Sequence, residues 1–404
     1  MRPQASLSME APANVADPHA ASESNRPVPL LDVQRGNRPL LDEIQQAISQ
    51  VCDSGRFLHG PEVTQLEQSV AEYTGAAHAI GCASGSDALL LALMARGIGR
   101  GDEVICPSFT FFATASAVWR LGAKPVFVDI DPVTFNIDAS QVEAALTPST
   151  RAIIPVHLFG QCADMEAILA LAGTHGLFVL EDAAQAIGAG YGAAKAGAIG
   201  DVGAFSFYPT KNLGGFGDGG MVTTNDDRMA QVLRIMAAHG MQPRYFHPVV
   251  GINSRLDSIQ AAVLNVKFAR LNGWTTDRRT NAGRYDELLA DAKLDQNLVL
   301  PQTARGCWHV WNQYTIRVPE GRRDALRRHL ADAQIGSEVY YPQPLHQQDC
   351  FRHLGYREGD LPETERAAAE VLSLPIFPEL TIEEQQTVVK RIATFYAGKQ
   401  YAAA

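Results

Sequence analysis

Two residues that could act together on a carbonyl compound lie 29 positions apart in this chain. Lys211 ends the segment Phe205–Lys211 and is followed by the glycine-rich stretch 212–220, and Asp182 follows the apolar run 177–180. A lysine amine can bind a carbonyl cofactor as a Schiff base, and a carboxylate can keep a ring nitrogen of that cofactor protonated. The pair therefore predicts a Schiff-base site.

The elements that must position this pair alternate along the chain. Short apolar runs predict buried strands at 104–105, 125–128, 153–156, 178–180, 204–207 and 220–224. Helical spacing predicts helices at 41–51, 63–73, 87–96, 113–121, 139–146 and 165–175, and helices dominate 230–270 and 281–290. Alternation of this kind indicates an α/β fold, a mainly parallel sheet with helices on both faces.

The chain is longer than one hydrophobic core usually supports, which predicts two domains. After the large domain, 27–275, we expect a smaller C-terminal α/β domain, 276–404. Its predicted strands are 313–318 and 337–341, and its predicted helices are 323–333 and 381–396. Residues 1–26 are rich in Ala, Ser and Pro and have no signal-peptide pattern, so they predict a disordered leader.

Composition excludes several classes of protein. A net charge of −10 argues against a nucleic-acid binder, which needs a basic face. The strongest apolar run, 88–95, is too short to cross a bilayer, so no membrane segment is expected. The six cysteines are scattered without a CxxC pair, which predicts no disulfide framework, no metal site and reduced thiols in a cytoplasmic enzyme.

One motif is a false lead. Residues 215–220 match the pattern G-x-G-x-x-G of dinucleotide-binding proteins. That pattern binds a dinucleotide only where it follows a strand and opens a helix, whereas here it leads into a predicted strand. We interpret these glycines as giving the backbone freedom around Lys211.

Eight segments in order, between about Pro29 and Leu380, resemble the DegT/DnrJ-type (DegT/StrS) sugar aminotransferases. They are Ser54–Pro61, Ala83–Leu89, Gly101–Ile105, Pro155–Gly160, Glu181–Gln185, Phe205–Asn212, Gly251–Asp257 and Tyr341–His346. The resemblance implies a fold-type-I aminotransferase that uses pyridoxal 5'-phosphate (PLP), with active sites at the interface of a homodimer.

The resemblance also implies roles around the cofactor ring. Lys211 would form the internal aldimine and later move the proton at the reacting carbon. Asp182 would pair with the pyridinium nitrogen, the alternative being a helix cap at the strand end. Phe111 would stack on the ring, the alternative being a core aromatic. Gln185 would lie one helical turn from Asp182, near the ring substituents.

A second group of residues resembles the family's phosphate and substrate contacts. Gly85 and Ser86 open a helix and, with Ser206, would hold the cofactor phosphate, although a plain N-cap and a buried serine are the alternatives. Asn253 would reach the phosphate of the neighbouring subunit, unless it only forms a turn. Tyr341 and His346 would meet the sugar nucleotide or, alternatively, pack.

Two further polar residues are assigned to the structure rather than to the chemistry. His157 lies in an apolar strand and is interpreted as a hydrogen-bonded core histidine. Glu181 points to the opposite face of its strand from Asp182 and is interpreted as structural.

The sequence thus predicts a PLP-dependent enzyme that moves an amino group onto a nucleotide-linked keto-sugar, with glutamate as donor by family analogy. Such amino sugars would serve polysaccharide biosynthesis. One alternative is a sugar dehydratase of the same fold, a branch that replaces the lysine with histidine, against which Lys211 argues. The other is a regulatory protein that keeps the fold without turnover.

Overall fold

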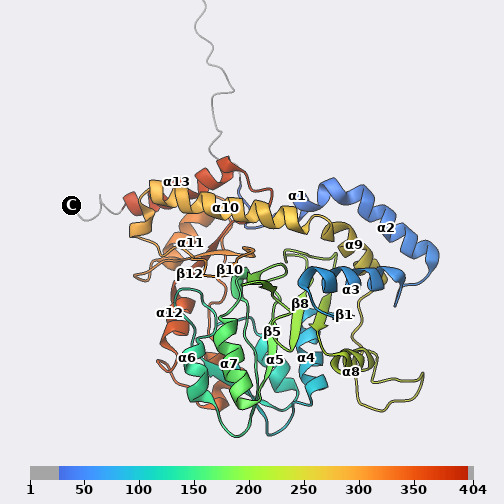
Figure 1. Ribbon diagram of the computed structural model, residues 1–404. Helices are drawn as coiled ribbons and strands as arrows, with labels where there is room; N and C mark the ends of the chain where they lie inside the picture. Colours follow the sequence, from blue (N-terminus) through green and yellow to red (C-terminus); the bar gives the residue numbers. More distant parts are fainter. Residues whose placement is uncertain (1–26, 399–404) are drawn as a thin grey trace, which may run out of the picture.

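A seven-stranded sheet forms the centre of the computed structural model, which describes residues 27–398 (Figure 1). Its strand order is β1-β9-β8-β5-β4-β2-β3, and every neighbouring pair is parallel except the two that involve β9. The strands are β1 His78–Cys82, β2 Glu103–Pro107, β3 Lys124–Val128, β4 Thr150–Ile153, β5 Phe178–Asp182, β8 Val202–Ser206 and β9 Gly220–Thr224. The predicted mainly parallel sheet is confirmed.

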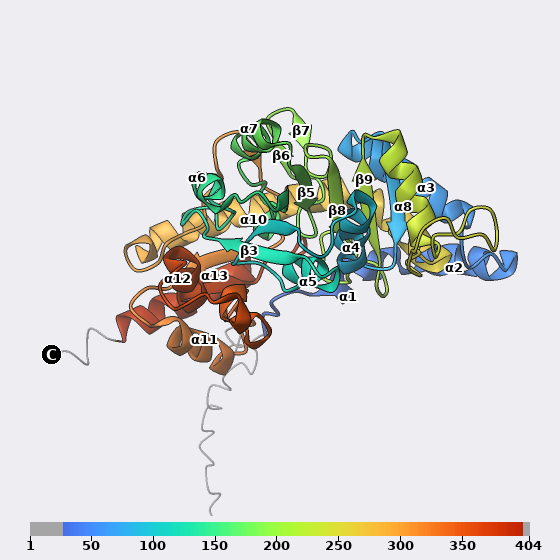
Figure 2. The same cartoon turned by 90° about the horizontal axis from the view of Figure 1, so that it is seen from below.

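Helices cover both faces of this sheet (Figure 2). The helices up to β9 are α1 Val33–Asn37, α2 Leu41–Ser54, α3 Pro61–Thr74, α4 Gly85–Arg96, α5 Ala113–Arg120, α6 Ala139–Val142 and α7 Met165–His175. Successive strand residues point to opposite faces, so each face has its own core. Leu180 of β5 packs with α4 and α5, whereas its neighbour Val179 packs with α6 and α7.

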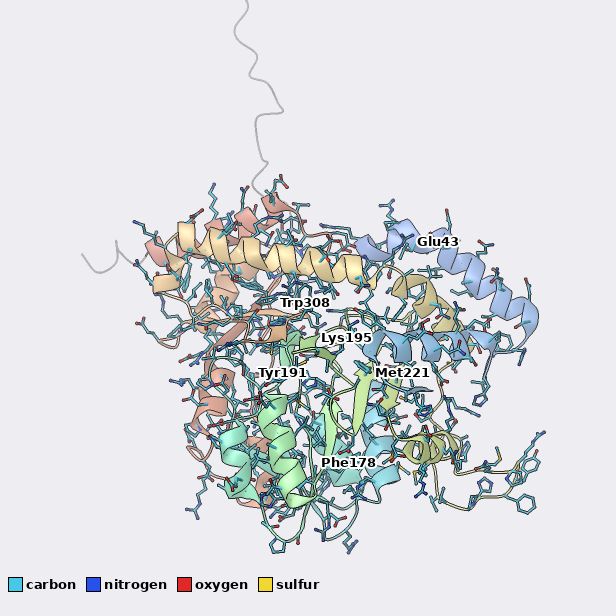
Figure 3. All side chains as sticks on the ribbon, in the orientation of Figure 1. Glu43, Phe178, Tyr191, Lys195, Met221 and Trp308 are labelled. Carbon is cyan, nitrogen blue, oxygen red and sulfur yellow. The ribbon has the colours of Figure 1, made fainter. Side chains whose placement is uncertain are left out.

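The same division extends across the sheet. Phe178, at the start of β5, belongs to the core formed with α4 and α5, whereas Met221 of β9 packs with α3 and α9 Ser258–Phe268 (Figure 3). The side of the sheet next to α3 is therefore closed by a helix, α9, that comes from much later in the chain.

The remaining elements come from the C-terminal half of the chain, except for two short strands at residues 190–195. They are α8 Asp227–Ala237, α10 Leu271–Asp291, α11 Arg323–Asp332, α12 Pro362–Glu370 and α13 Ile382–Ala397, the pair β11 Tyr314–Arg317 and β12 Val371–Leu374, and the small sheet of β10 Cys307–Trp308, β6 Gly190–Tyr191 and β7 Ala194–Lys195. In Figure 1, α10 runs along the top of the molecule above α11 and beside α13. Its buried residues share a core with β11, β12, α11 and α13.

Several predicted elements of this half are wrong. Residues 238–257 form an irregular loop between α8 and α9 rather than a helix. The segment 337–341 is not a strand and makes one isolated bridge, Glu338 with Ser373. The true partner of β11 is β12, a short apolar run directly after α12.

The predicted domain boundary, residue 275, falls inside α10. The C-terminal core also buries Phe109 and Phe135 from the first half of the chain, so the two halves share side chains. The division into a large and a small domain stays a prediction, and the predicted leader lies outside the described residues. Within residues 27–398, no helix is both long enough and apolar enough to cross a membrane.

Candidate active site

The predicted chemistry gathers at one edge of the central sheet. Asp182 is the last residue of β5 and Ser206 the last of β8, and these strands run parallel. Gly85 opens α4 shortly after β1, and Phe111 lies in the loop after β2. Ligands of open α/β sheets bind beyond the carboxyl ends of the strands, so this edge is the expected place for a site.

Asp182 is buried, and its carboxylate accepts only two hydrogen bonds from the part of the chain that the structure describes. One carboxyl oxygen accepts a hydrogen bond from the Thr114 hydroxyl at 2.7 Å, and the other accepts from the Ala184 amide at 3.3 Å. Burial raises the pKa of Asp182, while Thr114, Ala184 and the charge of Lys211 pull it back down. A cationic group bound beside Asp182 would therefore be strongly favoured. No helix follows Asp182, so the alternative of a helix cap fails.

Lys211 lies in a tight loop after β8. Its amide donates to the Tyr208 carbonyl at 2.9 Å, and Asn212 is fixed by a hydrogen bond from its amide to the Val310 carbonyl at 3.0 Å. Burial lowers the pKa of Lys211 to about 8, against the opposing effect of Asp182. A substantial fraction of the lysine is thus neutral near pH 8, the form in which an amine attacks a carbonyl.

Gly85 and Ser206 lie in contact. A Cβ atom at Gly85 would come within 2.6 Å of the Ser206 Cβ, so only glycine fits there. Ser84 caps α4 by accepting from the Asp87 amide, and the amides of Gly85 and Ser86 remain as the free first donors of the helix. The structure therefore brings the three predicted phosphate residues to one helix N-terminus, where an anion is favoured.

An aromatic group stands over this edge. Phe111 is 57% exposed, which excludes the core alternative in the single chain, and its ring centroid lies 6.1 Å from that of Tyr341. The Tyr341 hydroxyl accepts from the Gln185 side-chain amide at 3.1 Å, and the Gln185 oxygen accepts from the Phe159 amide. Gln185 sits in a turn rather than a helix, which corrects the expected helical spacing.

His346 does not match its predicted role. It is buried, with Nδ1 at 2.7 Å from the Ser108 hydroxyl and Nε2 at 3.2 Å from Glu365. Both ring nitrogens are thus engaged inside the chain, and neither is free for a sugar nucleotide. The structure favours the packing alternative, in which His346 fixes the loop that carries Tyr341.

Asn253 is exposed, and its side chain makes no hydrogen bond to the rest of the described chain. The neighbouring Ser254 is buried, and its hydroxyl accepts from the Ala83 amide at 3.1 Å, in the loop that leads to Gly85. Asn253 therefore lies on a fixed backbone near the phosphate residues, with its amide open to another molecule.

His157 and Glu181 are structural, as expected, although His157 lies after β4 rather than in a strand. His157 and Glu181 are both buried and hydrogen-bond to each other at 2.8 Å. Glu181 also accepts from the backbone amides of Gly197, Ile199 and Gly200. The false dinucleotide motif leads directly into β9, as predicted. No group of three metal-ligating side chains occurs between residues 27 and 398.

The chain also matches known proteins along most of its length. The model of the DegT/DnrJ/EryC1/StrS aminotransferase family matches residues 40–393. The chain belongs to this family. PLP is the cofactor of the family, so membership confirms the predicted fold, cofactor and reaction class. The buried amine, the buried acid and the helix N-terminus above are the groups that could hold this cofactor.

Individual relatives agree with this placement. One is a "pleiotropic regulatory protein" of Geobacillus stearothermophilus, 55% identical over 91% of this chain and 98% of its own. Another, the UDP-N-acetyl-3-dehydro-alpha-D-glucosamine 3-aminotransferase of Acidithiobacillus ferrooxidans, is 48% identical over 92% of this chain and 97% of its own. The crystal structure of S. venezuelae DesV in complex with a ketimine intermediate superposes with a TM-score of 0.88 at 44% identity, covering 91% and 98% of the two chains.

One residue that contacts Asp182 was not predicted from the sequence. Thr114 hydrogen-bonds to Asp182, although 68 residues separate them. Its only signal was its position in the segment 108–114, which also carries Phe111. The first turn of α5 turns this hydroxyl toward the end of β5.

Proposed function

We propose that this protein transfers the amino group of an amino-acid donor, glutamate by family analogy, to the keto group of a nucleotide-linked sugar. The observation that carries the proposal is a lysine of lowered pKa beside a buried, partly satisfied aspartate at the carboxyl edge of the sheet. The relative from Acidithiobacillus ferrooxidans is named for such a sugar. Amino-sugar formation for polysaccharides in the cytoplasm is the matching cellular role.

Each residue has a proposed task. PLP, when bound, supplies a carbonyl for the amine and an electron-withdrawing ring. Lys211 binds the cofactor and afterwards moves the proton between donor carbon and cofactor. Asp182, pinned by Thr114, holds the ring nitrogen in its protonated form. The helix N-terminus at Gly85 and Ser86, with the Ser206 hydroxyl, binds the phosphate.

The open side of the site is assigned to the ring and the substrate. Phe111 offers an exposed aromatic face that stacks on the cofactor ring. Gln185 orients Tyr341, whose buried hydroxyl lies near Asp182, and we assign Tyr341 to the sugar-nucleotide contact. His346 contributes indirectly, because its ring is already bonded on both sides.

Lys211→Ala tests the core of this proposal. The variant is expected to fold, to lose the visible absorbance of lysine-bound cofactor and to lose transamination with glutamate and a panel of nucleotide keto-sugars, 3-keto sugars first. Lys195→Ala is the matched control and should leave both unchanged. Near-normal turnover by Lys211→Ala would refute the assignment.

We further propose that the active form is a homodimer with composite sites. The exposed Asn253 amide and the loop before it support this proposal, because that loop exposes the apolar side chains of Tyr245, Phe246 and Val250. Exposed apolar groups of this kind mark protein contacts. A two-fold dimer would present each Asn253 to the partner's phosphate site.

Mixing two inactive variants tests the composite site. Asn253→Ala must first be shown to weaken PLP retention while the dimer stays intact. In a mixed dimer of Lys211→Ala and Asn253→Ala subunits, one site carries both lesions and the other neither, so activity should partly return. If Asn253 acts within its own chain, each site keeps one lesion and mixing restores nothing.

A second candidate is a regulatory protein without turnover, favoured by the name of the Geobacillus relative. The visible absorption spectrum, recorded with and without glutamate, distinguishes the two candidate functions. A transaminase that holds PLP changes its visible absorbance when glutamate is added, whereas a non-catalytic protein does not.

A further inference from the structure

The loop that carries Lys211 is closed at its base. The Phe207 amide donates to the Gly219 carbonyl at 2.8 Å, and the Gly215 amide donates to the Phe207 carbonyl at 2.8 Å. Gly214 folds back on Pro209, since a Cβ at Gly214 would lie 2.4 Å from the Pro209 carbonyl oxygen. Any group that holds residues 214–216 therefore also fixes the turn in which Lys211 stands.

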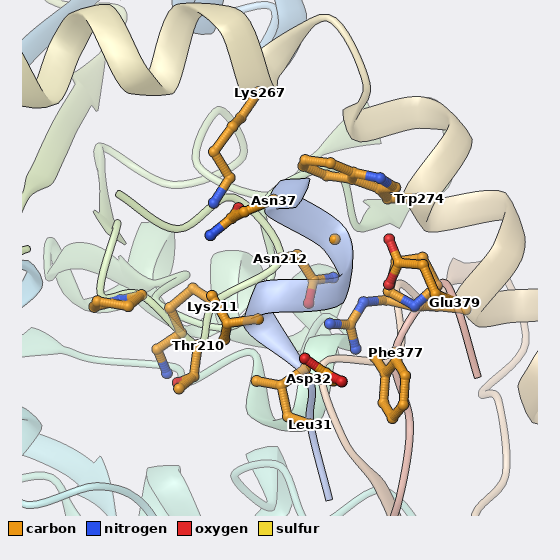
Figure 4. A pocket seen from close by; sticks show the side chains of 15 residues that line it. Leu31, Asp32, Asn37, Thr210, Lys211, Asn212, Lys267, Trp274, Phe377 and Glu379 are labelled. Carbon is orange, nitrogen blue, oxygen red and sulfur yellow. The ribbon is translucent and has the colours of Figure 1, made fainter. Parts of the chain in front are cut away.

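Helix α9 supplies two such groups from one face. Lys267 reaches from α9 toward this loop, and its Nζ donates to the Gly214 carbonyl at 2.5 Å (Figure 4). Gln260, seven residues earlier and thus two turns away, accepts from the Phe216 amide at 2.8 Å. The loop is anchored at two successive points by a helix that lies far from it in sequence.

Using Lys267 for this contact lowers the stability of the fold, because its ammonium group is buried. Its side chain is 4% exposed and forms no ion pair with any carboxylate among residues 27–398. Burial lowers its pKa to about 8, and Glu379 opposes that shift. Lys267 also lines a small cavity, together with Asn37, Arg278, Glu379 and Lys211. Besides donating to the Gly214 carbonyl, the ammonium lies near the rings of Phe216 and Trp274, at 5.7 and 6.0 Å from their centroids. A buried charge with one hydrogen-bond acceptor costs stability, which calls for a role.

We propose that Lys267 is a positioning residue of the transamination site, which holds the Gly214 carbonyl so that the Lys211 amine points at the cofactor. This inference rests on Lys211 being the cofactor lysine. Lys267 touches neither cofactor nor substrate in this role. It acts through the backbone between Gly214 and Lys211, and Gln260 supports it from the same helix face.

Lys267→Met tests the role, because methionine fills most of the space without the charged donor. Losing a charge-assisted hydrogen bond should weaken PLP binding to the apoprotein about tenfold. Turnover should fall by a similar factor, with the KM for glutamate changed by less than twofold. The midpoint pH of the visible absorbance should also move, because the Lys211 amine is no longer held. The control is Lys195→Met in β7 (Figure 3), because the Lys195 Nζ also donates to a backbone carbonyl, that of Tyr73 at 2.7 Å, but not to the loop of Lys211.

The outcomes separate this inference from the proposed function. If Lys267→Met changes only the melting temperature and keeps wild-type PLP affinity, turnover and absorbance midpoint, Lys267 is merely structural. Should the variant fail to fold, Gln260→Leu replaces it, with weaker PLP binding expected and unaltered binding contradicting the anchor. Borohydride trapping followed by peptide mapping checks the premise: a label on a lysine other than Lys211 refutes the cofactor assignment itself.

Discussion

Glu181 and Asp182 are adjacent carboxylic acids on β5, and exchanging each for its amide should have opposite consequences. Both side chains are buried. Glu181 receives four hydrogen bonds of 2.7–2.8 Å, from the His157 ring and from the amides of Gly197, Ile199 and Gly200. His157 donates through Nε2, because its Nδ1 accepts from a backbone amide, that of Ala163.

The magnitude for Glu181→Gln follows from these donors. A glutamine oxygen still accepts two of them, but its NH₂ group faces the other two and cannot accept. Each buried donor left without a partner costs about 1–3 kcal/mol, so unfolding should be easier by about 2–6 kcal/mol. With an unfolding entropy of about 2.1 cal/mol/K per residue over 404 residues, the melting temperature should fall by about 2–7 °C.

The assay compares thermal melting with turnover measured well below the melting temperature. Glu181→Gln should melt early yet keep turnover within about twofold. Asp182→Asn should melt as the wild type does and lose at least about a hundredfold in turnover, because a neutral amide does not stabilise a protonated ring nitrogen. Glu287→Gln, on the exposed face of α10, is the neutral control. An unchanged melting temperature for Glu181→Gln, or an unchanged rate for Asp182→Asn, would refute the division of roles.

Two further predictions concern the groups around the site. Burial lowers the pKa of Lys211 to about 8 from an ordinary 10.5, so between these values Lys211 binds more protons in the unfolded chain and its own contribution to stability rises with pH. Urea unfolding of the wild type and of Lys211→Met at pH 8 and 10 isolates this contribution from that of Lys267 and other titrating groups, and the stability of the wild type relative to the variant should increase from pH 8 to pH 10. Thr114→Val removes the hydroxyl that pins Asp182 and should slow turnover about tenfold, whereas Thr114→Ser should stay near wild type; equal rates for the two variants would contradict the pinning role.

The sequence predicted the sheet edge well because strands and their ends have local signals. The apolar run before Asp182 predicted a buried strand, and β5 indeed runs from Phe178 to Asp182. The glycine cluster after Lys211 predicted a loop rather than a helix. These features depend on a few neighbouring residues, so the local hydrophobic pattern is enough to predict them.

The C-terminal half was predicted less well because its elements depend on distant partners. The run 371–374 is only four residues long and follows a helix without a break, yet it pairs with β11 more than fifty positions earlier. The segment 337–341 has a strand-like composition but finds only one bridging partner. A short strand forms where a neighbouring strand has an unpaired edge to bond with, and local β-propensity does not reveal where such an edge lies.

The site residues divide in the same way. Lys211 and Asp182 could be predicted as candidate site residues because an amine and a carboxylate are reactive side chains that the sequence shows directly. Thr114 and Lys267 act only through contacts with segments 68 and 53 residues away. Apart from the place of Thr114 in the segment that carries Phe111, nothing in the neighbouring sequence distinguishes them from an ordinary helical threonine and lysine. Their roles emerge only once the fold places α5 under Asp182 and α9 over the loop.

Adjacent acids on one strand also show how a fold separates structure from chemistry. Alternation sends Glu181 and Asp182 to opposite sides of β5. On its side Glu181 meets four donors, which occupy both lone pairs of each oxygen and leave no capacity for a ligand. Asp182 meets two donors, Thr114 and Ala184, and keeps free lone pairs and a raised pKa. The acid with free lone pairs is the one that gains most from a cationic partner, which supports our proposal that the cofactor nitrogen lies beside Asp182.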